Sequence, residues 1–260
     1  MKITNVKELE KIANEIRIDI IETVYRAQSG HPGGSLSCTG ILTVLFFNQM
    51  NISLENPKEK LRDRFILSKG HCSPALYSTL AKKGFFSEKE LYTFRNINSN
   101  MQGHPDMNKV PGVDMSTGSL GQGLSIANGI ALVSKIDNLD YRVYCLLGDG
   151  EIEEGQIWEA AMCANKYKLD NLCAIVDYNH LQIDGNIEDV KGLNKISEKF
   201  ESFGFETISI DGNNIAQIIE AFEKAKQIKG KPTMIVANTI KGKGVSFMEN
   251  EARMARKSTE

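Results

Sequence analysis

Two apolar runs, each followed by polar residues, constrain the fold of this chain more than any other feature. Residues 143–147 lead into Gly148-Asp149-Gly150, and residues 172–176 lead into a segment that contains Asn179. The stretch between them has the character of a helix, so the order is strand, helix, strand. A βαβ unit places the carboxyl ends of its two parallel strands at the same edge of the sheet. We therefore expect Asp149 and Asn179 to lie close together.

Asp149 and Asn179 offer a carboxylate and an amide oxygen, which are hard ligands that suit Mg²⁺. Such an ion keeps several waters and can share its coordination with a diphosphate. Gly148 and Gly150 would let the backbone approach that diphosphate closely. Two other interpretations stay open at this point. A Gly-Asp-Gly segment can be a plain strand-to-loop turn, and an asparagine after a strand can cap a turn.

Helical and strand patterns alternate throughout the 260 residues, and no linker rich in Pro, Ser or Gly divides them. This alternation predicts an α/β fold with a mostly parallel sheet and helices on both faces. We expect one domain over residues 1–245 and a polar C-terminal tail over residues 246–260. The pattern predicts loops at 29–34 and 101–115, helices at 6–27, 37–48, 73–82, 88–96, 122–136, 157–168, 194–203 and 214–228, and strands at 64–67, 143–147, 172–176, 206–210 and 233–238.

The overall charge and the cysteines limit the class of protein. A net charge of −2 gives no reason to expect a nucleic acid or a membrane as partner. The longest apolar run, residues 41–47, is far too short to span a bilayer, and residues 1–10 lack the apolar core of a signal peptide. The five cysteines form no CxxC pair, which is typical of reduced thiols. We expect a cytoplasmic protein.

Five motifs follow one another in a characteristic order. They are Ser29-Gly30-His31-Pro32-Gly33-Gly34, the segment 62–71 with the letters RDRFILSKGH, Gly103-His104-Pro105, the segment 117–123 with the letters TGSLGQG, and Gly-Asp-Gly with its later asparagine. Over residues 10–250 the chain resembles the N-terminal, diphosphate-binding half of transketolases. The resemblance implies a thiamine diphosphate-binding fold, with thiamine diphosphate and Mg²⁺ (or Ca²⁺) as cofactors.

The resemblance also assigns cofactor ligands. The metal would be held by the side chains of Asp149 and Asn179 and by the backbone carbonyl of Leu181. Lys69 would pair with phosphate charge, and Ile183 would pack against the thiazolium ring, although an ordinary core isoleucine is the competing interpretation. The full set of expected cofactor contacts is Lys69, His71, Gly118, Ser119, Leu120, Gly148, Asp149, Gly150, Asn179 and Ile183.

Three of the four histidines, His31, His71 and His104, lie in predicted loops beside Gly or Pro. A single loop histidine is often merely exposed, but all three fall in motifs that match the family. The resemblance implies that His31 and His104 face the hydroxyls of a donor sugar and transfer protons near neutral pH. It places His71 near the diphosphate and the thiazolium. His180 matches no family role, and we expect it at the surface or behind the metal ligands.

Four glutamates follow the Gly-Asp-Gly motif. A carboxylate cluster that opens a helix is usually explained by the helix dipole alone. In transketolases, however, glutamates at the positions of Glu154 and Glu159 lie at the interface between subunits, and the resemblance implies the same role here.

Two departures from the family pattern bear on activity. The glutamate that activates thiamine diphosphate comes, in transketolases, from the pyrimidine-binding domain of another subunit, which this chain lacks. The chain is then either a fragment or one subunit of a split enzyme. We expect the split enzyme, in which this chain is inactive alone and forms an α2β2 assembly with a C-terminal pyrimidine-binding subunit. The reaction would move a two-carbon ketol unit from a ketose phosphate to an aldose phosphate.

The second departure is Ala255, which stands where the family has a catalytic histidine. Loss of one positioned acid or base typically costs on the order of a hundredfold in rate, so Ala255 bears on the reaction and its substrate more than on the cofactor. The alternatives are a related thiamine diphosphate enzyme that acts on a modified sugar or makes 1-deoxyxylulose 5-phosphate, and a non-catalytic paralogue that binds cofactor without turnover.

Overall fold

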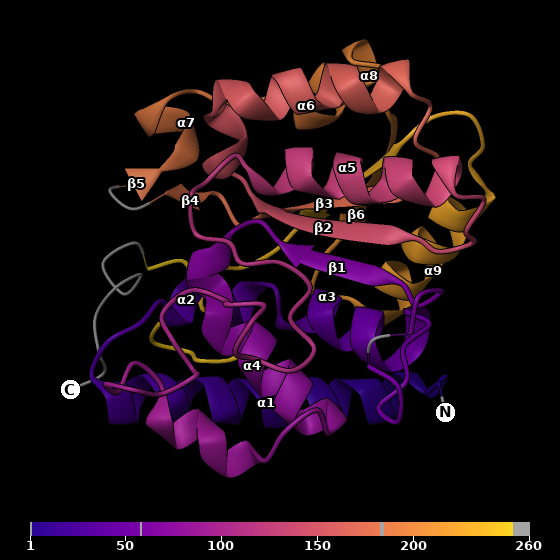
Figure 1. Ribbon diagram of the computed structural model, residues 1–260. Coiled ribbons are helices and arrows are strands. Elements are labelled where there is room, and N and C mark those ends of the chain that lie inside the picture. The colour runs from indigo at the N-terminus through magenta and orange to yellow at the C-terminus, as the bar shows by residue number, and fades with distance from the viewer. Residues whose placement is uncertain (1, 58, 183–184, 252–260) are drawn as a thin grey trace.

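A five-stranded parallel sheet forms the centre of the computed structural model, which describes residues 2–57, 59–182 and 185–251 (Figure 1). Every neighbouring pair of strands is parallel, in the order β1-β2-β3-β7-β6. The predicted α/β fold is thus confirmed. The strands are β1 (Arg64–Leu67), β2 (Val143–Gly148), β3 (Leu172–Tyr178), β6 (Glu206–Asp211) and β7 (Thr233–Asn238), and a separate antiparallel pair joins β4 (Leu181–Gln182) to β5 (Gly185–Asn186).

Helices cover both faces of the sheet (Figure 1). One layer contains α1 (Val6–Ala27), α2 (Pro32–Ser37), α3 (Thr39–Val44), a π-helix (Leu45–Gln49), α4 (Ser73–Lys83) and α9 (Ile215–Gln227). The other contains α5 (Gly123–Ile136), α6 (Gly155–Lys166) and α8 (Ile196–Ser202). The other described helices are short. They are α7 (Ile187–Val190) and the 3₁₀ helices Gly70–Cys72, Glu88–Thr93 and Glu151–Glu153.

Strand β2 shows why two layers are needed. All six of its residues are buried. Tyr144 and Leu146 pack in the core under α1 to α4, whereas Val143, Cys145 and Leu147 pack in the core under α5 and α6. Because successive side chains of a strand point to opposite faces, a strand that is apolar at every position must be covered on both sides.

Most predicted elements are confirmed within a few residues, but three predictions were wrong in detail. The expected loop at 29–34 ends early because α2 begins at Pro32, a residue whose fixed φ favours the first helical position. The helix expected over 37–48 is broken at Cys38 and ends as a π-helix. The segment 88–96 forms a 3₁₀ helix only as far as Thr93.

The segment after β7 returns to the body of the protein. Gly242 donates a backbone hydrogen bond of 3.0 Å to Gly33, and Met248 is 1% exposed in the core. The described part of the expected tail is therefore anchored to the core at Met248, while Ala255 lies outside the described residues. None of the described helices combines the length and the apolar character that a membrane crossing requires.

Candidate active site

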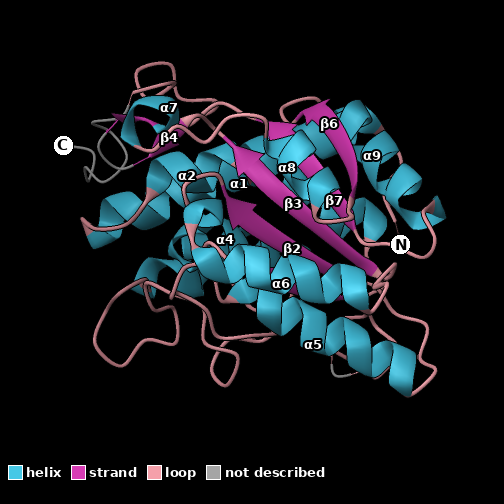
Figure 2. Cartoon of the chain, turned by 90° about the horizontal axis from the view of Figure 1, so that it is seen from above, coloured by secondary structure: helices cyan, strands magenta, loops and turns pink. Residues whose placement is uncertain are grey.

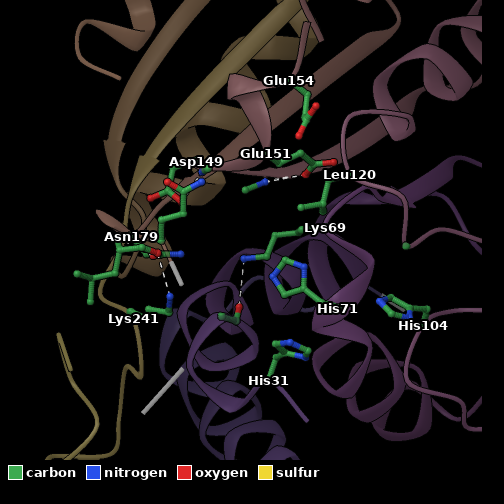
Figure 3. Close-up of a pocket in the computed structure, with 16 residues that line it drawn as sticks. His31, Lys69, His71, His104, Leu120, Asp149, Glu151, Glu154, Asn179 and Lys241 are labelled. Atoms are coloured by element: carbon green, nitrogen blue, oxygen red, sulfur yellow. Dashed lines mark hydrogen bonds between the residues drawn. The ribbon is translucent and has the colours of Figure 1, made fainter. Parts of the chain in front are cut away.

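A pocket of about 410 Å³ opens at the carboxyl ends of β1, β2 and β3 (Figure 3). Figure 2 shows that the carboxyl ends of β2 and β3 point toward α2. Twelve predicted site residues line it although they come from six separate stretches of sequence. They are His31, Lys69, His71, His104, Gly118, Leu120, Gly148, Asp149, Gly150, Glu154, Asn179 and Leu181.

The three predicted metal ligands lie together at one end of this pocket. Asp149 and Asn179 are each 4% exposed. Asp149 accepts backbone hydrogen bonds from Gly150 at 2.9 Å and from His180 at 2.8 Å. His180 has a left-handed backbone with φ of 64°, which turns the chain so that its N–H faces Asp149. The carbonyl of Leu181 accepts a 2.9 Å hydrogen bond from the ammonium of Lys241.

The donor set suits a hard cation that also binds phosphate. Burial, followed by the charge of Asp177, raises the pKa of Asp149 to about 6. Within the described part of the chain, no three His, Cys, Asp or Glu side chains are grouped so that they could hold a metal alone. One carboxylate, one amide and one carbonyl leave several positions for water and diphosphate oxygens, as Mg²⁺ requires. The residues present therefore fit Mg²⁺ with a diphosphate.

Backbone close to the pocket leaves room for such a group. A Cβ on Gly150 would lie 2.9 Å from the Gln182 side chain, and one on Gly118, which has φ of 152°, would lie 3.0 Å from the His104 ring. Only glycine keeps these two loops at their present distance. Lys241 and Gln182, which the sequence analysis did not select, line the same pocket.

Lys69 lines the pocket, but its ammonium group is held by other residues of the protein. The Lys69 side chain is 1% exposed, and its ammonium forms an ion pair with Asp177 and donates a 3.2 Å hydrogen bond to the carbonyl of Gly34. Burial by itself would lower the pKa of Lys69, but the Asp177 carboxylate outweighs burial and holds that pKa well above its ordinary value. Asp177 was missed in the sequence analysis, although a charged residue at the end of an apolar strand is a signal that could have found it.

The three motif histidines gather on the opposite side of the pocket from Asp149 (Figure 3). The rings of His31 and His71 are 5.2 Å apart between centroids and meet edge to face. Burial, then the nearby His71 and Arg95, lower the pKa of His104. Arg95 in turn donates a 3.1 Å hydrogen bond to Ser29. The lowered pKa favours the neutral imidazole of His104, which can accept a proton.

Glu151, one of the four glutamates that follow the Gly-Asp-Gly motif, lines the pocket and joins three segments of the chain. It is 3% exposed and accepts hydrogen bonds from the hydroxyl of Ser68 and from the backbone N–H groups of Gly121 and Gly148, both at 3.0 Å. Burial raises the pKa of this carboxyl. Its contacts span 83 residues of sequence, so local pattern could not reveal them.

Comparison with known proteins decides the family. A model of the transketolase thiamine diphosphate binding domain matches residues 9–255. This chain belongs to the transketolase family. It is 45% identical to an apulose-4-phosphate transketolase subunit of Phocaeicola vulgatus over 95% of this chain and 88% of that protein. It is 47% identical to a 6-deoxy-6-sulfo-D-fructose transketolase subunit of Clostridium sp. over 94% of this chain and 89% of that protein.

Single-chain transketolases are much longer than this chain. Human transketolase is 43% identical over 94% of this chain, but the match spans only 38% of the human protein. The crystal structure of Campylobacter jejuni transketolase superimposes with a TM-score of 0.92 at 34% identity, over 98% of this chain and 41% of that one. The predicted resemblance to the N-terminal half of transketolases, and to enzymes divided into subunits, is confirmed.

The remaining predicted site residues are distributed more widely. Glu154 lines the main pocket, whereas Glu159 lines a separate pocket of about 330 Å³ between α5 and α6. Ser119 is exposed and does not line the main pocket. Ile183 lies outside the described residues. The interface role of the two glutamates and the cofactor contacts of Ser119 and Ile183 stay predictions.

Proposed function

We propose that this chain is the diphosphate-binding subunit of a split, Mg²⁺-dependent (or Ca²⁺-dependent) transketolase that moves a two-carbon ketol unit from a ketose phosphate to an aldose phosphate. One observation carries the proposal. Twelve residues from the family's motifs converge on one pocket, in a chain that covers about nine tenths of subunit relatives and about two fifths of single-chain transketolases. A C-terminal pyrimidine-binding subunit would complete the site, in an α2β2 assembly, and we expect the protein to be cytoplasmic.

Each part of the pocket has a chemical task in this proposal. Thiamine diphosphate, when bound, supplies a nucleophilic carbon that can attack a ketose carbonyl. Asp149, Asn179 and the Leu181 carbonyl would hold Mg²⁺, which in turn would hold the diphosphate. Gly118, Ser119 and Leu120 would contact the aminopyrimidine ring. These two groups of residues would thus hold the cofactor at its diphosphate and at its aminopyrimidine ring.

The histidines would serve the sugar. His31 and His104 lie on the side of the pocket away from the metal ligands (Figure 3), where a donor sugar could present its hydroxyls. The lowered pKa of His104 leaves its imidazole neutral, so it can take a proton from a hydroxyl and return it later. His71 lies between this group and the metal end, close to Lys69 in sequence.

A modified sugar is the second candidate substrate. Both subunit relatives carry names that refer to unusual sugars, apulose 4-phosphate and 6-deoxy-6-sulfo-D-fructose. Ala255 in place of the family histidine also favours a modified sugar, because one acid–base group of the ordinary reaction is missing. The intact metal and histidine sets argue against a non-catalytic paralogue.

A ketol-transfer assay tests the proposal. The chain, co-expressed with its pyrimidine-binding partner, would receive xylulose 5-phosphate and ribose 5-phosphate, with and without thiamine diphosphate and Mg²⁺. Apulose 4-phosphate and 6-deoxy-6-sulfofructose would serve as alternative donors. We expect turnover that needs both chains and both cofactors, and that Asp149→Ala abolishes. Turnover by the single chain would contradict the split-enzyme proposal, and a cofactor-loaded complex inactive on every donor would favour the paralogue.

A further inference from the structure

The carboxylate of Asp177 is fully buried and surrounded by hydrogen-bond donors. It lies near the end of β3, where its backbone is paired with Gly148 of β2 on one side and with Ala237 of β7 on the other. One oxygen, Oδ2, accepts from Ser37 at 2.6 Å and from the ammonium of Lys69. The other oxygen, Oδ1, accepts from the hydroxyl of Thr239.

Asp177 also holds the amide of Asn179, one of the proposed Mg²⁺ ligands. The Nδ2 group of Asn179 donates to Oδ2 of Asp177 at 3.3 Å, while Oδ1 of Asn179 accepts from the backbone N–H of Leu181 at 3.2 Å. An amide has one end that only donates and one end that only accepts. With the amide turned over, its oxygen would face a carboxylate and its NH₂ would face another N–H. Both contacts would then be repulsive.

The orientation matters because only the oxygen end can ligate a cation. Asp177 cannot take that role itself, since donors already occupy both of its oxygens. Lys69 forms an ion pair with Asp177 in the interior, so the charge of the buried carboxylate has a partner of opposite sign. The pair therefore adds no net charge next to the metal end of the pocket.

We propose that Asp177, neutralised by Lys69, is a positioning residue that fixes the Asn179 amide with its oxygen toward the catalytic cation. The inference rests on the proposed function, in which Asn179 ligates Mg²⁺. Residues that orient a metal ligand through one hydrogen bond typically change metal affinity by about tenfold to a hundredfold when they are replaced.

The test measures cation binding and does not depend on turnover. Mn²⁺ would be the probe, with free Mn²⁺ counted by electron paramagnetic resonance in the complex of this chain with its partner subunit. We expect Asp177→Asn to weaken Mn²⁺ binding by about tenfold or more. Adding Asn179→Asp to this variant should restore binding, because a carboxylate presents an oxygen at either end. A purely structural role for Asp177 predicts no such rescue.

Two further variants separate orientation from stability and charge. Thr239→Val removes the donor to the other oxygen of Asp177 and should lower the melting temperature while leaving Mn²⁺ affinity within about twofold. The double substitution Lys69→Met with Asp177→Leu replaces a buried ion pair by apolar side chains, a change that folded proteins commonly tolerate. It leaves the net charge unchanged, so its expected loss of Mn²⁺ affinity reports orientation alone.

Three results would overturn the inference. Wild-type Mn²⁺ affinity in both Asp177→Asn and the double variant would show that Asn179 needs no positioning. A loss in Asp177→Asn that Asn179→Asp fails to rescue would assign Asp177 a structural role only. A wild-type complex that binds no Mn²⁺ would remove the proposed metal site as well. Failure of ketol transfer alone, with Mn²⁺ binding as expected, would count against the proposed function and not against this role.

Discussion

The ammonium of Lys241 lies 2.9 Å from the backbone carbonyl of Leu181, a proposed ligand of the catalytic cation. Lys241 is 8% exposed and lines the main pocket, and burial lowers its pKa. A buried positive charge at this place would attract the diphosphate of the cofactor and would compete with a cation for the Leu181 carbonyl.

Lys241→Met should therefore act in opposite directions on the two cofactors. We expect thiamine diphosphate affinity to fall by about tenfold, since hydrogen bonds to charged groups contribute about 1.5–3 kcal/mol, and affinity for the metal alone to rise. Isothermal titration calorimetry measures both. Lys243→Met makes the same change of charge two residues away, where the ammonium pairs with Glu249 at 3.3 Å, and should alter neither affinity more than twofold or so. Equal losses in the two variants would contradict a specific role for Lys241.

The lowered pKa of His104 predicts that its ring gains a proton only at acid pH. Because burial, His71 and Arg95 all disfavour the imidazolium, the midpoint should lie below the ordinary value of 6.5. A histidine whose pKa is depressed by folding contributes stability above its unfolded pKa, and this contribution is lost as pH falls through the folded pKa. Donor turnover that needs neutral His104 should decline over the same acid range.

Nuclear magnetic resonance can follow the His104 ring directly, since the chain has only four histidines. Arg95→Gln removes a positive charge that disfavours the His104 imidazolium, so the midpoint should move upward, toward 6.5. Arg26→Gln removes a cation that lies over the Tyr92 ring instead and should leave the midpoint in place. A midpoint above 6.5 in the wild type would show that burial does not control His104.

Glu151→Gln should lower the stability of the protein, because Glu151 links the segments that surround the pocket. Both carboxylate oxygens of Glu151 accept from backbone N–H groups, those of Gly121 and Gly148. A glutamine has one oxygen only, so its NH₂ would face one of these donors. A buried donor left without a partner costs about 1–3 kcal/mol. Thermal unfolding measures the loss, with the exposed Glu10→Gln on α1 as control. A melting temperature equal to that of the control would show that Glu151 is not needed to join the loops.

Gly129 on α5 offers a test of the partner interface. A Cβ at this residue would meet no atom within 4 Å, and Gly129 lines the pocket between α5 and α6 with Glu159. In the isolated chain, Gly129→Ala should stabilise the helix by about 0.5–1 kcal/mol. If this face packs against a partner subunit, the added methyl group should weaken assembly by about fivefold or more. Analytical ultracentrifugation measures the assembly, and unchanged association would place the interface elsewhere.

Local sequence pattern was enough to predict most helices and strands and the family. Helix α1 and strand β7 have the bounds that periodicity predicts, because a helix or a strand repeats its apolar positions at a fixed interval. Order and spacing of the motifs were enough to place Asp149 and Asn179 together, since parallel strands bring their carboxyl ends to one edge.

Only the tertiary structure decided which side chains support these residues. Lys69 and Asp177 are 108 residues apart in sequence, and Ser68 and Glu151 are 83 apart. Such pairs depend on which strand ends and loops meet at the carboxyl edge of the sheet, and no local repeat in the sequence encodes that contact. The same charged residue can cap a helix, face solvent or neutralise a buried partner, and the choice is made by the burial and by the donors that the folded chain places around it.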